Sequence, residues 1–216
     1  CIVRLIDPET GSAEIGGVDL ATLNGAALRR ERRRVQMVFQ DPYGSLNPRT
    51  RVGQIIAEGP IAAGVPAPEA RKRARELLEV VGLDASAADR FPHEFSGGQR
   101  QRIGIARALA LDPELIIADE AVSALDVSIQ AQVLDLLAEL KTRLRLSMLF
   151  VTHDLRVAAQ ICDRIAVMQR GRIVELGPVA EVFGAPKSDY TRDLLAAIPG
   201  RGPGTPLKRF AAGAGA

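Results

Sequence analysis

The 216-residue sequence is poor in the features that mark secreted and membrane-spanning proteins. It has two cysteines, Cys1 and Cys162, too few for a disulfide framework or a cysteine-based metal cluster. No apolar run approaches the roughly 18 residues that a transmembrane helix needs. No segment near the start has the charged-then-apolar pattern of a signal peptide. These absences favour a reducing, cytosolic compartment.

Lysine is also scarce, although the overall charge is nearly balanced. The sequence has 28 basic and 26 acidic residues, which give a net charge of +2. Four of the basic residues are lysines: Lys72, Lys141, Lys187 and Lys208. The near balance argues against a general nucleic-acid binder, so we expect no nucleic-acid partner. The apolar fraction of 47% is enough to form a sizeable core.

Strand-like and helix-like segments alternate along most of the chain, which predicts an α/β fold with a mainly parallel sheet. We expect strands at 35–39, 115–118, 147–152, 164–169 and 172–176, and helices at 51–63, 69–81, 96–112, 127–144 and 155–162. The continuous apolar runs at 115–118 and 147–152 predict strands buried on both faces. Gly16 and Gly17 predict a hairpin turn near the start.

The first six residues suggest that the sequence starts inside an element. Residues 1–6 are apolar and lack a helix cap, and Met37 is the first methionine. We therefore expect a helix already in progress at Cys1, and a natural N-terminus that lies further upstream.

Two acids follow the apolar run at 115–118. Asp119 and Glu120 would lie at the carboxyl end of a strand, where open α/β sheets bind ligands. An acid there can hold Mg²⁺, and a second can take a proton from an attacking water. The alternative is a pair of solvated acids that end a strand.

A second candidate is the stretch Ser96-Gly97-Gly98-Gln99, which opens a predicted helix. Ser96 can cap the helix, and two residues without Cβ allow a phosphate to approach the backbone N–H groups. The alternative is an ordinary glycine-rich cap.

Two further candidates also follow predicted strands. His153 comes after the run at 147–152, and Gln40 comes directly after Phe39. A glutamine at a strand end can contact a metal or a water. The alternatives are a structural histidine and a plain polar loop residue.

Taken together and in this order, these motifs resemble the ATPase domain of ABC transporters. They match its Q-loop, signature motif, Walker B with catalytic glutamate, D-loop and switch histidine: Gln40, Ser96-Gly97-Gly98-Gln99, Asp119-Glu120, Ser123-Ala124-Leu125-Asp126 and His153. Three further stretches resemble the dipeptide, oligopeptide and nickel importer branch: residues 38–49, 125–132 and 190–199. The resemblance covers residues 1–199.

The resemblance implies a P-loop NTPase-like fold and a role for each residue. Asp119 would hold Mg²⁺, and Glu120 would act as general base. His153 would contact the γ-phosphate. Gln40 would sense the metal and couple to the membrane subunits.

The signature residues and the D-loop would act across a dimer. Ser96, Gly97, Gly98 and Gln99 would cap an ATP held mainly by a partner domain, and Asp126 would line the interface. The implied partners are a second ATPase subunit, identical or related, two transmembrane permease subunits and an extracytoplasmic solute-binding protein. The chain would lie at the cytoplasmic face of the membrane and drive import of peptides or a related small solute.

The resemblance also implies the domain limits. The ATPase domain would cover residues 1–184, with an incomplete antiparallel β part at the start and a helical subdomain at about 50–112. An importer-type C-terminal extension would cover 185–199, and a disordered tail 200–216.

One family motif, the phosphate-cradling G-x-x-x-x-G-K-[ST] loop, is absent from these 216 residues, because none of the four lysines follows a glycine. Loss of that lysine and its ring of N–H donors predicts that this chain alone does not hydrolyse ATP. Two alternatives stay open: a non-catalytic partner that lends its signature motif, and a non-transport ATPase of the same superfamily.

Overall fold

The computed structural model describes residues 1–41 and 44–198, and the chain divides into two units, 1–149 and 150–216. Each unit is described by itself below. Several sequence-based expectations lie outside the described residues: the disordered tail at 200–216, and the importer-like residues Pro42, Tyr43 and Pro199.

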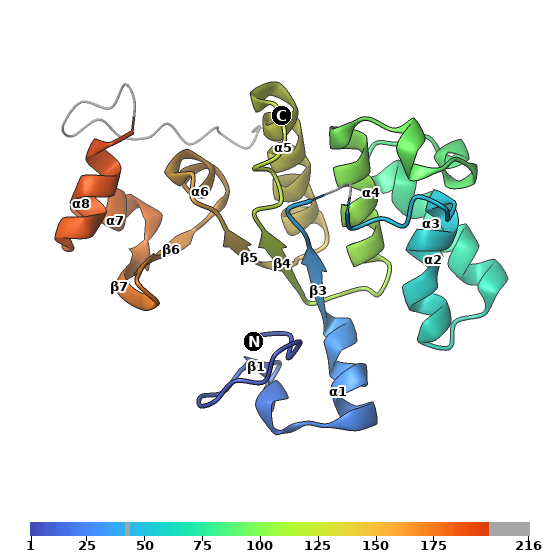
Figure 1. Ribbon diagram of the computed structural model, residues 1–216, viewed down its shortest axis with the longest axis horizontal. Helices are drawn as coiled ribbons and strands as arrows, with labels where there is room; N and C mark the ends of the chain where they lie inside the picture. The colour runs from blue at the N-terminus through green and yellow to red at the C-terminus, as the bar shows by residue number, and fades with distance from the viewer. Residues whose placement is uncertain (42–43, 199–216) are drawn as a thin grey trace. The chain divides into compact units, whose positions relative to one another are not determined.

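The first unit holds most of the parallel sheet and a group of helices (Figure 1). Its strands are β1 (Glu14–Ile15), β2 (Val18–Asp19), β3 (Val35–Val38), β4 (Leu115–Asp119) and the start of β5 (Ser147–Val151). Its α-helices are α1 (Gly25–Glu31), α2 (Val52–Ala62), α3 (Ala67–Val80), α4 (Gly97–Leu109) and α5 (Val127–Arg143). Short 3₁₀ turns are η1 (Leu20–Thr22), η2 (Arg32–Arg34), η3 (Ala85–Asp89) and η4 (Pro92–Glu94).

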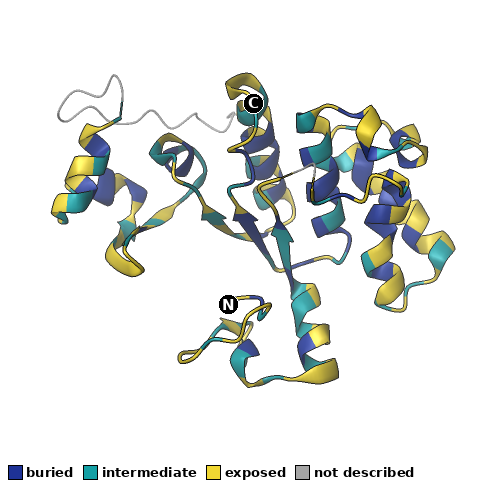
Figure 2. Ribbon diagram, in the orientation of Figure 1, coloured by how far each residue is buried: buried dark blue, intermediate teal, exposed yellow. Residues whose placement is uncertain are grey.

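The sheet has the strand order β3-β4-β5, and β3 and β4 are parallel with Val38 opposite Ala118. Ile116, Ile117 and Ala118 of β4 are at most 5% exposed, which confirms the prediction of a buried strand (Figure 2). Ile117 packs in one buried cluster with Val3, Leu20 and Val35.

The prediction that β5 is also buried on both faces is wrong. Its residues alternate between exposed and half-buried, and Leu149 and Val151 are 38% and 44% exposed. The faces of β5 are less covered by other side chains, whereas Ile117 of β4 packs in the buried cluster with Val3, Leu20 and Val35. An apolar run does not reveal which parts of the chain cover its faces.

Helices α2, α3 and α4 pack against one another in the first unit. The apolar face of α3, which comprises Ala70, Ala74, Leu77 and Leu78, is at most 2% exposed. The helix is followed by Gly82 with φ of 74°, a conformation that favours glycine just after a helix. The helix predicted at 69–81 is confirmed as α3.

The expectation of a helix at residues 1–6 is also wrong. These residues form turns, and Arg4 has φ of 55°. The Arg4 guanidinium donates to the carbonyl oxygens of Leu20, Ala21 and Leu23. These bonds and the positive φ of Arg4 hold the segment in turns.

The second unit, described over 150–198, contains the end of β5, α6 (Leu155–Ile161), β6 (Arg164–Gln169), β7 (Arg172–Pro178), α7 (Val179–Gly184) and α8 (Asp189–Ala196). Strands β6 and β7 form an antiparallel hairpin, and both turn residues, Arg170 and Gly171, have positive φ. Two positive φ angles match the twist of a two-residue hairpin. The buried cluster comprises Ala159, Val167, Val179, Val182, Phe183 and Leu195.

Glu175 of β7 connects the hairpin to the segment before α8. Its carboxylate accepts hydrogen bonds from the backbone N–H groups of Lys187 and Ser188, at 2.9 and 3.0 Å. The bond from Lys187 is the main reason that the pKa of Glu175 is lowered. Within residues 1–41 and 44–198, no helix combines the length and apolar character that crossing a membrane requires.

Candidate functional site

The ends of β3 and β4 bring three of the predicted site residues to one edge of the sheet. Gln40 lies two residues beyond Val38, and Glu120 lies two residues beyond Ala118, its partner in register. Asp119 is the last residue of β4. Gln40 and Asp119 are exposed, and Glu120 is half-buried. Because the strands are parallel, all three lie at the carboxyl edge, as predicted from the sequence.

Glu120 has an unusual backbone conformation. Its φ is 46°, in the left-handed region that costs a residue with a side chain about 1–2 kcal/mol. Ser123 holds the turn, because its N–H and its hydroxyl both donate to the Glu120 carbonyl at 3.0 Å. Strained residues cluster at functional sites. Nothing in the sequence indicates this conformation.

The motif Ser96–Gln99 begins α4 with a reciprocal capping box. The Ser96 Oγ accepts the N–H of Gln99 at 3.3 Å, and the Gln99 Oε1 accepts the N–H of Ser96 at 3.0 Å. The predicted cap is therefore confirmed. The first N–H groups of a helix have no partner within it, so those of Gly97 and Gly98 can face an anion.

Gly98 has a second role that the sequence analysis missed. A Cβ at this position would lie 2.3 Å from Cγ2 of Ile129, far inside van der Waals contact. The start of α4 therefore packs closely against the first turn of α5. Asp126, which precedes α5, is exposed and makes no side-chain cap bond. The close packing places the signature motif and the D-loop motif at neighbouring helix ends.

His153 belongs to the second unit, where it follows β5 and is exposed. The residues on either side fix its backbone. The Thr152 hydroxyl accepts the N–H of Asp154 at 3.0 Å, and Asp154 accepts the N–H of Arg156 at 2.8 Å, which caps α6. The Arg156 guanidinium, at 2.9 and 3.1 Å, lowers the pKa of the Asp154 carboxyl.

A comparison with models of known protein families agrees with this arrangement. A model described as ABC transporter matches residues 1–123, more than half of the chain and the part that includes the β3 and β4 strand ends. The chain belongs to the ABC transporter family.

Relatives within the ABC family extend the match along almost the whole chain. A protein of Brucella ovis named as a peptide import ATP-binding protein is 51% identical over 209 residues, which are 96% of this chain and 66% of that protein. An oligopeptide transport ATP-binding protein of Mycobacterium tuberculosis is 52% identical over 198 residues, 92% of this chain and 32% of that protein. The chain thus spans about two thirds of the Brucella relative's length.

Two solved ABC structures share the fold. An ATP-binding cassette in a dimeric post-hydrolysis state, bound to ADP and Pi, has a TM-score of 0.70 and 31% identity, covering 81% of this chain and 76% of that chain. A Clostridium perfringens subunit of an ABC transporter complex has a TM-score of 0.76 and 27% identity, covering 92% and 77%. The predicted α/β fold of an ABC ATPase is confirmed.

The chemistry of the β3 and β4 strand ends fits the Mg²⁺ that ABC proteins use with nucleotides. Asp119 and Gln40 supply carboxylate and amide oxygens, the donors that this hard cation prefers. Among the described residues, no group of three His, Cys, Asp or Glu side chains could form a metal site on protein ligands alone. A donor set of this size suits Mg²⁺, which takes one or two carboxylates and completes its shell with phosphates and water.

Two residues of α4 that the sequence analysis did not single out contact the segment after β3. Gln101 donates to the Phe39 carbonyl and Arg107 donates to the Ser45 carbonyl. A signal for the first was present, because Gln101 is a polar residue at the i, i+4, i+7 spacing from Ile105 and Ala108. All three are at most 2% exposed.

Proposed function

We propose that this chain is the ATP-binding and ATP-hydrolysing part of an ABC importer for peptides or a related small solute. The observation that carries the proposal is the convergence of Gln40, Asp119 and Glu120 at one carboxyl sheet edge. It occurs in a chain 51% identical to a protein named for peptide import.

The residues at the strand ends would each have a separate role in hydrolysis. Asp119 and Gln40 would hold Mg²⁺, whose charge offsets the charge that develops on the transferred phosphoryl group. Glu120 would take the proton of the attacking water. The Ser123 hydroxyl closes the turn that carries it, by donating to the Glu120 carbonyl. His153 would donate a hydrogen bond to the γ-phosphate.

A second copy or a related subunit would complete the site. Ser96, Gly97, Gly98 and Gln99 would approach an ATP bound mainly to that partner, with the α4 N-terminus directed at the phosphates. Asp126 would lie at the same interface, since α4 and α5 begin side by side. The further partners are two permease subunits at the cytoplasmic face of the membrane and an extracytoplasmic solute-binding protein.

The 216 residues by themselves would not turn over ATP. They contain no G-x-x-x-x-G-K-[ST] stretch, so no lysine and no ring of glycine-loop N–H groups would hold the β- and γ-phosphates. Loss of a single preorganised donor already slows such chemistry by about 10²–10³-fold. Catalysis would therefore require phosphate-binding donors from outside these 216 residues.

Phosphate release with Mg²⁺ and ATP tests both statements. It is measured for the 216-residue chain, for the native-length protein and for the Glu120→Gln variant of each. We expect turnover by the native-length protein alone. Turnover by the 216-residue chain that Glu120→Gln removes would contradict the inactivity of the chain. A native-length protein that does not hydrolyse ATP alone, but raises ATP turnover by an intact partner, would indicate a non-catalytic subunit that supplies its signature motif.

Uptake of labelled peptides by cells that lack the gene tests the choice of solute. We expect uptake of short peptides to fall and to return when the native-length protein is supplied. Normal peptide uptake, together with loss of uptake of another small solute, would refute the peptide assignment and leave the ATPase assignment intact.

A further inference from the structure

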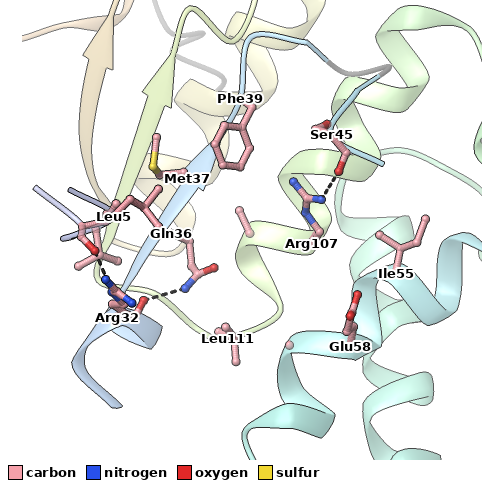
Figure 3. Close-up of a pocket in the computed structure, with 14 residues that line it drawn as sticks. Leu5, Arg32, Gln36, Met37, Phe39, Ser45, Ile55, Glu58, Arg107 and Leu111 are labelled. Carbon is pink, nitrogen blue, oxygen red and sulfur yellow. Dashed lines mark hydrogen bonds between the residues drawn. The ribbon is translucent and has the colours of Figure 1, made fainter. Parts of the chain in front are cut away.

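Helix α4 contacts the segment after β3 at two points, one near each end of that segment. We call residues 39–41 and 44–46 the post-β3 segment. Gln101 Nε2 donates to the Phe39 carbonyl at 3.5 Å, and the Arg107 guanidinium donates to the Ser45 carbonyl at 2.5 Å (Figure 3 shows the second bond). Each bond joins residues 62 positions apart in the chain.

One donor, Gln101, is buried, and the other, Arg107, is half-buried. Gln101 is 2% exposed, one of two polar or charged side chains that are buried among the described residues. Burial lowers the pKa of Arg107, and nearby Glu58 acts in the opposite direction. Buried polar groups persist in folded proteins when they are hydrogen-bonded. The two carbonyls of the post-β3 segment are therefore the partners that these side chains need.

Packing alone does not hold the first end of the segment. Phe39 is 42% exposed, and it borders a cavity of about 430 Å³ that Ile55, Glu58 and Arg107 also line. The other end is packed, because Leu46 is 2% exposed. The bond from Gln101 thus acts where apolar contact is weakest, and the bond from Arg107 reinforces the packed end.

We infer that Gln101 and Arg107 are positioning residues that make Gln40 and Ser96 move as one body. Gln40 directly follows Phe39, and Ser96 caps the same helix that carries both donors. The inference rests on the proposed function, in which Gln40 serves the chain's own ATP site and Ser96 serves the partner's. A shift at one site is then transmitted through a helix of 13 residues to the other.

Amide hydrogen exchange on the 216-residue chain tests the anchoring without any activity. Gln101→Leu and Arg107→Leu each remove one bond, and Arg107→Lys keeps the charge as a milder change. We expect exchange at residues 44–50 to rise about tenfold in Arg107→Leu, the factor that corresponds to one bond to or from a buried polar group, and to rise less in Gln101→Leu, whose bond is at the other end of the segment. Exchange across residues 102–109 should stay at the wild-type rate.

The matched control is Arg102→Leu. Arg102 is on the same helix and donates to a backbone carbonyl, that of Val81, at 2.7 Å. Its loss removes an equivalent bond that does not reach the post-β3 segment. Equal exchange at residues 44–50 in wild type and in all Gln101 and Arg107 variants overturns the anchoring, and so does an equal rise in Arg102→Leu.

The coupling is tested with Mg²⁺ and ATP on the native-length protein. In wild type we expect ATP to slow exchange at residues 96–102 and 44–50 together. In Arg107→Leu the response at 44–50 should fall at least about fivefold while that at 96–102 remains, which a general loss of stability would not produce. Unchanged responses at both segments overturn the coupling. A wild type without any response refutes the proposed function and leaves the anchoring result standing.

Discussion

The turn after β4 and the turn after β5 both lead from a strand into a helix, but different bonds hold them. In the first, the backbone is strained at Glu120, and Ser123 closes the turn on the Glu120 carbonyl. Asp126 starts the next helix without a side-chain cap bond. In the second, Asp154 caps α6 and pairs with Arg156.

The two turns show that an acid in a strand-to-helix turn has no fixed role. The carboxylate of Asp154 bonds within its own turn, where it accepts from the N–H and the guanidinium of Arg156. The turn after β4 is closed by the Glu120 carbonyl, and Asp119 is exposed at the sheet edge. The bonds of Asp154 stabilise its own turn, whereas we propose that the exposed Asp119 serves a ligand.

The largest expected effect separates the two aspartates by function. In the native-length protein, Asp119→Asn should raise the Mg²⁺ concentration for half-maximal ATP turnover at least about tenfold, since it removes a charged oxygen donor. Asp154→Asn is the matched control and should leave that concentration unchanged. Titrations of turnover with Mg²⁺ measure both. Equal shifts in the two variants would remove the distinction between the turns.

The next expected effect concerns how much Asp154 and Asp126 stabilise the helices that follow them. Asp154→Ala should lower the free energy of unfolding by about 1 kcal/mol, the usual loss when a helix N-cap is removed. Asp126→Ala should change it by less than about 0.5 kcal/mol, because that side chain makes no cap bond. Urea denaturation of the 216-residue chain compares the two. A larger loss at Asp126 would contradict the description of both helix starts.

Glycine at position 120 tests the strain in the first turn. Glu120→Gly and Glu120→Ala both remove the side chain, so their difference reports the backbone alone. With φ at 46°, we expect the glycine variant to be more stable by about 0.5–1 kcal/mol, which is the left-handed penalty less the extra entropy of unfolded glycine. An alanine variant of equal or greater stability, measured by the same denaturation, would show that the turn is unstrained.

The smallest expected effect is a dependence on pH in the second turn. Arg156 lowers the pKa of folded Asp154, so the unfolded state binds a proton first as the pH falls. The stabilisation is complete above the unfolded pKa of about 3.9 and is lost as the pH falls through the lower folded value. We expect stability to drop less in Arg156→Gln than in wild type between about pH 4 and pH 2. Parallel curves would show that the pair does not contribute.

The sequence predicted the elements that depend on local pattern. The apolar run at 115–118 became buried β4, and Ser96 became the cap of α4, because periodicity and cap residues act within a few positions. It also placed Gln40 after one strand and Asp119 and Glu120 after another, and the parallel pairing of β3 and β4 brings these residues to one edge.

The features that it missed depend on distant partners. The exposure of β5 depends on which parts of the chain cover its faces, and the need for glycine at 98 depends on Ile129 in another helix. The bonds from Gln101 and Arg107 span 62 residues and leave almost no local trace. The positive φ of Glu120 is the exception, because the bonds around it come from Ser123, three residues away.

The most direct test of the proposed function is the rate at which the native-length protein hydrolyses bound ATP in a single turnover, with and without Glu120→Gln. If Glu120 is the general base at this sheet edge, the substitution should slow the chemical step by about 10²–10⁴-fold and leave ATP affinity nearly unchanged. A hydrolysis rate within about threefold of wild type would show that the acid after β4 is not the base, and the assigned mechanism would fall.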